Sequence, residues 1–287
     1  MRKPEELQQA LTQAHYVIDS AQALTVALAL HLEKPLLVEG PAGVGKTELA
    51  KALSRVLLLP LIRLQCYEGL GEEKALYEWN YSKQLLHIQA DRKWDAASAD
   101  TMLEDIFSED YLMERPLLRS IRSEKQTVLL VDELDRVDEE FEAFLLELLS
   151  DFQVTIPELG TLQALHKPVV VLTSNATRAL SEALRRRCVY LYMDFPEPQR
   201  ERDIVMRKVP GIEQALVAQV VRLVQKLRQQ DLKKPPSVSE TLDWTHALKA
   251  LNVDTLDTQT VSQTAGLLLK HQSDLKRFEQ LGNLLAE

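Results

Sequence analysis

The sequence has 287 residues, enough for one large domain or two ordinary ones, and its 45% hydrophobic and 27% charged residues exclude a disordered chain. The 34 basic and 43 acidic residues give a net charge of −9, which argues against a nucleic-acid binder, because tight binding there requires Lys and Arg to neutralise phosphates. There is no apolar leader and no stretch long enough to cross a bilayer, so we expect a cytoplasmic protein without membrane insertion.

Residues 5–193 alternate helical and strand-like patterns. Helical patterns occupy residues 5–32, 47–58, 69–123 (for the most part) and 134–149, and strands are predicted at 35–38, 61–64, 128–131, 169–172 and 189–193. The runs at 128–131 and 169–172 are continuously apolar, which is typical of strands buried on both faces. Residues 152–156 and 161–164 flank Gly160 and predict a hairpin.

The character of the chain changes after Pro198, where no strand-like run remains. The helices predicted there cover residues 200–209, 212–230, 237–251 and 258–285, the third of them starting at a capping box of Ser237 and Glu240. Alternating strands and helices predict an α/β fold with a doubly wound parallel sheet, followed by a small all-helical domain. We therefore expect an α/β domain at 1–197 and a helical domain at 198–287.

A complete phosphate-loop motif, G-x-x-x-x-G-K-[ST], follows the first predicted strand and precedes a helix. In this motif, glycines let main-chain N–H groups turn toward phosphates, Lys46 reaches the β- and γ-phosphates, and the Thr47 hydroxyl ligates Mg²⁺. The residues expected to bind Mg²⁺-ATP are Gly40, Pro41, Ala42, Gly43, Val44, Gly45, Lys46, Thr47 and Glu48.

Two adjacent carboxylates, Asp132 and Glu133, follow the buried strand at 128–131. The spacing predicts that Asp132 holds the Mg²⁺ shell and that Glu133 polarises the attacking water, as in a Walker B motif. Asp135, Asp138, Glu139 and Glu140 are interpreted as a solvated helix start, because negative charge is favoured in a first turn.

Other phosphate-loop enzymes remain alternatives. A GTPase would require an N-K-x-D tetrapeptide, which the sequence lacks, and a metabolite kinase would transfer the γ-phosphate to a small molecule. The paired Asp132 and Glu133 favour an ATPase. The two cysteines, Cys66 and Cys188, are far apart and fit no metal-ligand spacing, so they are expected to be small buried hydrophobes in a reducing compartment.

The order of these motifs resembles that of AAA+ ATPases. The sequence between the motifs resembles the MoxR branch and its CoxD-like group, which is linked to maturation of carbon monoxide dehydrogenase. The resemblance to AAA+ ATPases rests on residues 40–47, 128–133, 171–175 and 184–188, and the resemblance to the subgroup rests on residues 63–69, 76–79 and 142–160. It implies that Asn175 is sensor 1, and that Arg187 is the arginine finger acting on a neighbouring subunit's ATP. Arg185 and Arg186 are alternatives to Arg187.

The resemblance also implies contacts and partners. Tyr16 and Val17 lie where the family's adenine pocket begins, and Tyr67, Trp79 and Tyr81 are candidate contacts to a pore or partner. The expected sensor 2 stretch at 237–243 has no arginine, so no sensor 2 residue is assigned.

By the same resemblance, the chain is expected to form a ring (a hexamer) and to act as an ATP-driven chaperone. Its client would be a metalloenzyme awaiting its cofactor, and its adaptor would be a protein with a von Willebrand factor A domain. No nucleic acid is expected as a partner, although an AAA+ motor or loader acting on nucleic acid remains the main alternative.

Overall fold

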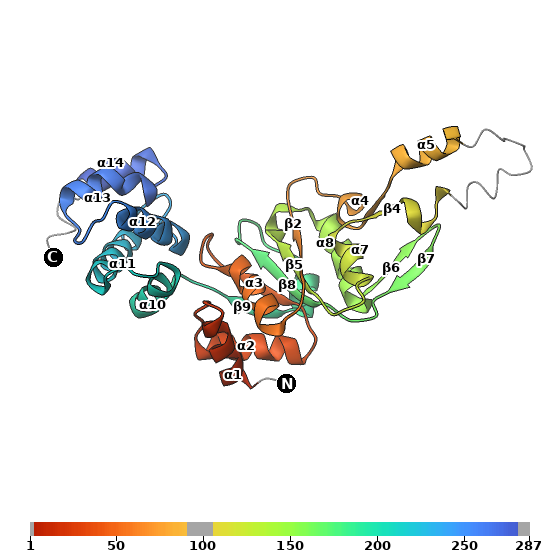
Figure 1. The fold of residues 1–287 in the computed structure, drawn as a ribbon, viewed down its shortest axis with the longest axis horizontal. Helices are drawn as coiled ribbons and strands as arrows, with labels where there is room; N and C mark the ends of the chain where they lie inside the picture. The colour runs from red at the N-terminus through yellow and green to blue at the C-terminus, as the bar shows by residue number, and fades with distance from the viewer. Residues whose placement is uncertain (1–2, 91–105, 281–287) are drawn as a thin grey trace, which may run out of the picture. The chain divides into compact units, whose positions relative to one another are not determined.

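The computed structural model describes residues 3–90 and 106–280, and the chain divides into two compact units that are interleaved in sequence (Figure 1). The first unit contains Leu24–Glu39 and Leu53–Leu191, and the second contains Arg2–Ala23, Gly40–Ala52 and Tyr192–Glu287. The phosphate-loop segment therefore belongs to the same compact unit as the C-terminal helices. The predicted domain boundary near Pro198 stays a prediction.

A five-stranded sheet forms the centre of the first unit, with strand order β2-β5-β8-β1-β9. The strands are β1 (Leu36–Glu39), β2 (Leu61–Gln65), β5 (Val128–Asp132), β8 (Val169–Ser174) and β9 (Val189–Tyr192). β2 pairs with β5, β5 with β8, and β8 with β1, all in parallel (Figure 1). β2, β5 and β8 follow one another across the sheet in chain order, but the first strand of the chain, β1, comes next, so the order is broken between β8 and β1. In open α/β sheets, ligands bind at such a point.

Helices cover both faces of this sheet. Leu37 packs in a core with α7 (Pro116–Ile121) and α8 (Glu139–Asp151). Its neighbour Leu36 lines a cavity with α2 (Ser20–His31) and the end of α3 (Lys46–Leu57). Because successive strand residues point to opposite faces, this alternation confirms a doubly wound sheet.

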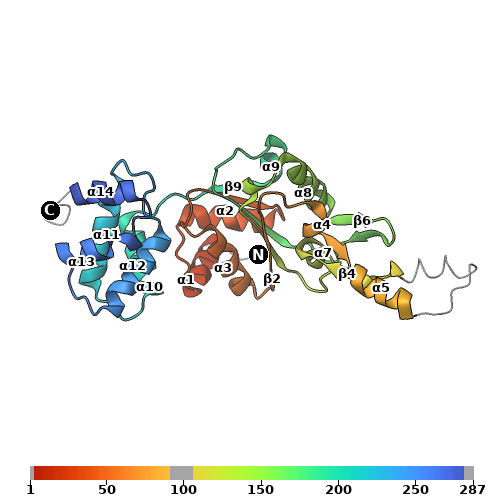
Figure 2. The same cartoon turned by 90° about the horizontal axis from the view of Figure 1, so that it is seen from above.

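In the described part of the C-terminal region, up to residue 280, every regular element is a helix, as predicted, and Figure 2 shows these helices clustered in teal and blue. It contains α10 (Pro198–Lys208), α11 (Gln214–Arg228), α12 (Val238–Ala250), α13 (Thr258–Thr264) and α14 (Gln272–Gln280). Trp244 of α12 is fully buried at its centre, and the indole N–H donates to Thr264 at 2.8 Å. The predicted capping box of Ser237 and Glu240 is present.

A buried ion pair ties three of these helices together. Glu201 of α10 is completely buried, and its carboxylate accepts two hydrogen bonds of 2.7 Å from Arg228 of α11. It also accepts from the hydroxyl of Thr241 on α12 at 2.9 Å. The Arg228 guanidinium lies 4.7 Å from the centre of the Phe195 ring, so the pair is packed as well as hydrogen-bonded.

Several predicted helices are interrupted. The N-terminal stretch forms α1 (Pro4–Gln13) and α2, with His15 in a left-handed conformation between them (φ 59). The helix predicted at 134–149 is a 3-10 turn (Leu134–Arg136) followed by α8, whose N-cap Asp138 accepts from the N–H of Phe141. The single helix predicted at 258–285 breaks into α13, a 3-10 turn (Ala265–Leu267) and α14, and its last residues lie outside the described part.

The segment predicted to be mostly helical at 69–123 also contains a small ladder. β3 (Tyr77–Trp79) pairs in antiparallel with β4 (Leu112–Glu114), between α4 (Glu72–Ala75), α5 (Tyr81–Ala90) and a 3-10 turn (Glu109–Tyr111). Short strands of this kind carry little periodic signal. The hairpin predicted around Gly160 is confirmed: β6 (Gln153–Ile156) and β7 (Gly160–Gln163) pair in antiparallel, and Gly160 has φ 79.

Candidate functional site

The phosphate loop has the backbone that its glycines permit. Gly40, Gly43 and Gly45 have φ of 153°, 75° and 103°, a region that strains other residues. A Cβ on Gly40 would collide with the main-chain carbonyl of Met193, whose carbon would lie 3.0 Å away. The loop is thus a tight turn held against the chain that follows β9.

Lys46 begins α3 and is 6% exposed. Its ammonium group donates to the carbonyl oxygens of Gly40 and Pro41, both at 2.7 Å. These bonds hold the positive charge over the loop itself, where a triphosphate would bind. The helix that follows presents its N-terminal N–H groups to the same loop, which favours an anion there.

A pocket of about 220 Å³ adjoins the loop within the second unit. Tyr16 and Val17, predicted at the adenine site, line it together with Gly43, Val44 and Gly45. Other apolar walls come from Met193, Ile204, Val238 and Leu242. Apolar walls beside a phosphate-binding loop suit a nucleobase, so the structure brings together the residues predicted for base and phosphates.

Hydrogen bonds fix the walls of this pocket. The Tyr16 hydroxyl donates to the Gly45 carbonyl at 3.3 Å, and burial raises the pKa of that phenol above its ordinary value. Arg200 of α10 donates to the carbonyl of Val17 at 3.1 Å. Glu48, predicted among the nucleotide-binding residues, lines the same pocket and forms an ion pair with Lys208 at 3.2 Å.

The predicted hydrolytic carboxylates lie in the first unit, at the carboxyl end of β5. Asp132 is 2% exposed, and its Oδ1 accepts a hydrogen bond of 2.5 Å from the hydroxyl of Thr173 on β8. The same hydroxyl accepts from the N–H of Glu133 at 2.9 Å. One Thr173 side chain therefore positions both carboxylate residues.

Glu133 lies in a left-handed conformation (φ 59), which is uncommon for a residue with a side chain. Such strain persists only where the surroundings fix it, and it is common at functional sites. The Glu133 carboxylate is about one-third exposed and pairs with Arg136 at 2.7 Å. The second oxygen of Asp132 pairs with Arg63 of β2 at 2.6 Å. Arg63 and Arg136 were not among the residues predicted from sequence.

The sequence indicated that Asp135 is solvated, and this prediction is wrong: Asp135 is only 5% exposed. Its carboxylate accepts from the N–H groups of Asn175 and Thr177, both at 3.1 Å, and from the Thr177 hydroxyl at 2.5 Å. Burial alone would raise the pKa of Asp135, but these hydrogen bonds outweigh it and lower the pKa. Asp135 thus ties the turn after Glu133 to the loop that carries Asn175.

The three candidate finger arginines end α9 (Glu182–Arg187) and differ in their contacts. Arg185 is half-buried, pairs with the buried Glu39 at 2.7 Å and lies over the ring of Tyr190, so its guanidinium is already bound within the same chain. Arg186 and Arg187 are exposed, and Arg187 donates to the hydroxyl of Ser150. The assignment of Arg187 as the finger stays a prediction, and the internal pairing of Arg185 argues against that alternative.

The three predicted aromatic contacts also differ. Trp79 is 7% exposed and packs edge-to-face against Phe107, so most of its indole lies in the core, although it also lines the groove that Tyr67 and Tyr81 border; its role as a contact stays a prediction. Tyr67 and Tyr81 are 43% and 62% exposed. They border one broad groove with Tyr77, and remain available to a partner.

The predictions for the cysteines hold in part. Cys66 is buried, and Cys188 is half-buried; burial raises the pKa of each thiol to about 12, so both are inert at neutral pH. In the described residues, no group of three or more His, Cys, Asp or Glu residues is arranged as a metal site.

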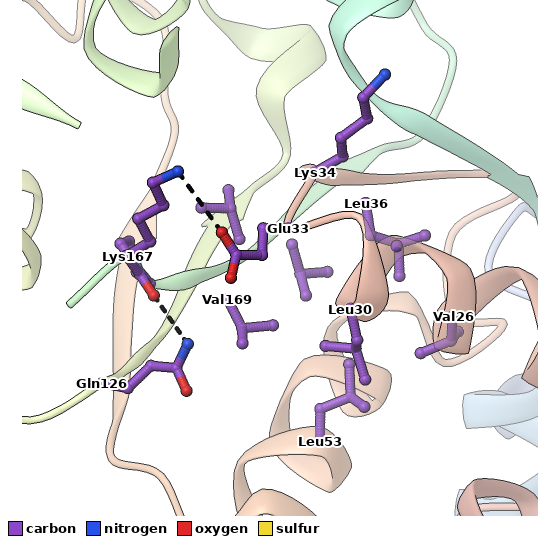
Figure 3. Close-up of a pocket in the computed structure, with 13 residues that line it drawn as sticks. Val26, Leu30, Glu33, Lys34, Leu36, Leu53, Gln126, Lys167 and Val169 are labelled. Carbon is purple, nitrogen blue, oxygen red and sulfur yellow. Dashed lines mark hydrogen bonds and ion pairs between the residues drawn. The ribbon is translucent and has the colours of Figure 1, made fainter. Parts of the chain in front are cut away.

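A second cavity lies within the first unit, at the amino-terminal ends of β1 and β8 (Figure 3). Its walls are apolar side chains such as Val26, Leu30 and Val169. Glu33 and Lys167 point toward each other at its rim, 3.5 Å apart. It offers about 30 Å³, far too little for a nucleotide, and none of the predicted site residues lines it.

No helix in the described ranges is long and apolar enough to cross a membrane.

The chain matches the AAA domain family (dynein-related subfamily) over residues 35–188, more than half of its length. It is 27% identical over 213 residues to the denitrification regulatory protein NirQ of Pseudomonas aeruginosa, covering 71% of this chain and 72% of NirQ.

More distant matches cover more of the chain. An uncharacterized protein of Staphylococcus epidermidis is 24% identical over 252 residues, 85% of this chain and 83% of that protein. Among solved structures, a RuvB mutant of Thermotoga maritima superposes with a TM-score of 0.52 at 18% identity, covering 93% of this chain and 73% of that one. This likeness shows a shared phosphate-loop AAA+ fold and nothing further.

Proposed function

Because this chain belongs to the AAA family (dynein-related subfamily), we propose that it is an ATPase that couples hydrolysis of Mg²⁺-ATP to remodelling of a client protein. The observation that carries the proposal is the phosphate loop: three glycines with positive φ, a buried Lys46 bonded over them, and an apolar pocket beside them. A triphosphate and a nucleobase are the chemistry that this arrangement fits.

In this proposal each residue has one task. The loop N–H groups and Lys46 bind the triphosphate, and Tyr16 and Val17 border the base. The hydroxyl of Thr47 and the carboxylate of Asp132 are oxygen ligands of the kind that Mg²⁺ prefers, and the ion would neutralise charge on the phosphates. Glu133 would accept the proton of the attacking water, and Asn175 would orient that water.

The finer assignment is also part of the proposal. We place the chain in the MoxR branch, near the CoxD-like group, with residues 1–197 as the ATPase domain and 198–287 as the lid. The subunits would form a ring, a hexamer, in which Arg187 reaches the neighbouring subunit's ATP. Its guanidinium is permanently charged, so it can stabilise charge on the transferring phosphoryl group. The resemblance given above supports a metalloenzyme as client and a von Willebrand factor A domain protein as adaptor.

The experiment that tests this role is affinity capture from the native cell with the Glu133→Gln variant in Mg²⁺-ATP. This variant should bind ATP without hydrolysing it and so retain its client. The double variant Lys46→Ala/Glu133→Gln is the control, since it should bind neither. Recovery of a metalloenzyme or of a von Willebrand factor A domain protein with the single variant alone supports the proposal.

Two other outcomes would replace it. Strong stimulation of the ATPase by DNA or RNA would indicate a nucleic-acid motor, against which the net charge of −9 argues. Transfer of labelled γ-phosphate to a small molecule, with no release of free phosphate, would indicate a metabolite kinase.

A further inference from the structure

The N-terminal turn of α12 lies directly on the phosphate loop, at the place where the sequence lacks a sensor 2 arginine. The main-chain N–H of Ser239 donates to the carbonyl oxygen of Gly43 at 3.2 Å, and its hydroxyl donates to the same oxygen at 3.4 Å. Gly43, Ser237 and Ser239 all belong to the second compact unit. The contact therefore joins the loop to the helical region within one unit.

The contact is tight enough to require glycine. A Cβ on Gly43 would lie 2.6 Å from the Cβ of Ser237 and closer still to its hydroxyl, and Gly43 also has φ 75. Ser237 cannot move aside easily, because it is the buried N-cap of α12. Its N–H donates to the carboxylate of Glu240 at 2.7 Å, and Glu240 also pairs with Lys234 at 3.0 Å. The first turn of α12 is thus a fixed platform.

The planarity of the peptide bond gives this platform a role. The carbonyl of Gly43 and the N–H of Val44 belong to one trans peptide plane, so they point in opposite directions. When Ser239 holds the carbonyl, the N–H of Val44 is directed away from α12. In the proposed function, the loop N–H groups are the donors to the phosphates. The direction of the Gly43 carbonyl therefore decides the direction of one phosphate donor.

We propose that Ser239 is a positioning residue: it holds the Gly43–Val44 peptide in the orientation that binds phosphate, and so links α12 to the nucleotide state. The inference rests on the proposed ATPase function. The link is mutual, because a nucleotide that fixes the Val44 N–H also fixes the carbonyl that Ser239 contacts. A neutral serine contact thus joins the loop to α12 at the stretch where no sensor 2 arginine is assigned.

The test uses substitutions that remove or keep the two donors of Ser239. Ser239 is exposed and is the second residue of α12, where proline is tolerated because first-turn N–H groups have no partner in the helix. Ser239→Pro removes the N–H and the hydroxyl, Ser239→Ala removes the hydroxyl alone, and Ser239→Thr keeps both donors. Gln259→Pro is the matched control, since Gln259 is the second residue of α13 and also exposed.

The affinities of the full chain for ATP and for adenosine separate positioning from a general loss of structure. Loss of one or two hydrogen bonds predicts an ATP affinity about five- to ten-fold weaker in Ser239→Pro and about two-fold weaker in Ser239→Ala. Adenosine, which has no phosphate, should bind all variants alike, and Ser239→Thr and Gln259→Pro should match the wild type. Ser239→Ala decides the question if Ser239→Pro does not fold.

Two results would overturn the inference. One is wild-type ATP affinity in both the proline and the alanine variants of Ser239. The other is an equal loss of ATP and adenosine binding, which would show that the whole pocket had been disturbed. A wild-type chain that binds no ATP is a different result, because it would reject the proposed function itself.

Discussion

The hydroxyl of Thr173 donates to Asp132 at 2.5 Å, and through this bond β8 fixes the carboxylate at the end of β5. The same oxygen accepts from the N–H of Glu133, whose backbone is left-handed. A single side chain thus positions the predicted magnesium ligand and the predicted general base. Without this hydroxyl the N–H of Glu133 would lose its acceptor, and the left-handed backbone that positions the Glu133 side chain would be less stable. We therefore expect Thr173 to be required for hydrolysis.

Thr173→Val keeps the shape of the side chain and removes the hydroxyl. We expect kcat for ATP hydrolysis to fall about ten-fold or more, since the Asp132 carboxylate loses a donor and the main-chain N–H of Glu133 loses its acceptor. The affinity for ATP should change little, because the phosphate loop is untouched. Thr173→Ser is the control and should retain activity. A kcat of Thr173→Val equal to that of the wild type would show that Thr173 does not position the site.

Asp135 predicts a pH dependence of stability. The folded-state pKa of Asp135 is lowered below its unfolded value of about 3.9. The ionised carboxylate therefore stabilises the fold above about pH 4, and this contribution is lost as the pH falls through the folded pKa. Asp135→Asn should lower the free energy of unfolding at pH 7 by about 2 kcal/mol, because it weakens hydrogen bonds to a charged acceptor.

The difference between wild type and Asp135→Asn should narrow as the pH is lowered toward 3, measured by urea unfolding at each pH. Glu139→Gln removes an exposed carboxylate nearby and serves as the control. A difference that stays constant with pH would mean that the ionised form of Asp135 contributes nothing.

Much of the fold followed from the sequence, and the misses have physical causes. The buried strands β5 and β8 were predicted because continuous apolar runs are typical of parallel strands. The ladder of β3 and β4 was missed because three-residue strands show no clear alternation. Asp135 looked like an acidic helix start, and only the fold brings Asn175 and Thr177 close enough to bury it.

The candidate site likewise contains residues that the sequence predicts and residues that only the fold reveals. Lys46, Asp132 and Glu133 belong to contiguous motifs that can be read along the chain. Thr173 and Arg63 contact Asp132 from neighbouring strands, across 41 and 69 residues of sequence, so no local pattern identifies them. Trp79 was expected to contact a partner, and only the fold shows that most of its indole is buried beside Phe107 while it also lines the groove with Tyr67 and Tyr81.

The ion pair of Glu201 and Arg228 should dominate the stability of the helical region. Glu201→Gln removes the charge that compensates a buried guanidinium, which is 7% exposed. We expect the free energy of unfolding to fall by about 3–5 kcal/mol, as is usual when one partner of a buried pair is removed. Asp231→Asn removes the partner of Arg277 at the surface and should change it by less than about 0.5 kcal/mol. Equal effects in chemical denaturation would contradict this ranking.

The finger assignment can be tested by mixing variants. If the chain forms the proposed ring, Arg187→Ala alone and Lys46→Ala alone should each be inactive. A mixture should regain ATPase activity, because an intact Arg187 on a Lys46→Ala subunit can reach ATP bound by its Arg187→Ala neighbour. The same mixture made with Arg186→Ala compares the adjacent exposed arginine. If no mixing ratio restores activity with Arg187→Ala, this arginine does not act on a neighbouring subunit's ATP.

The central claim is that the loop from Gly40 to Thr47 binds a nucleoside triphosphate with magnesium. Isothermal titration calorimetry tests it most directly: ATP is titrated into the purified, folded chain in the presence and in the absence of Mg²⁺. We predict one magnesium-dependent site per chain, abolished by Lys46→Ala and retained by Glu133→Gln. The absence of any binding heat with the folded wild type, or unchanged affinity in Lys46→Ala, would contradict the account.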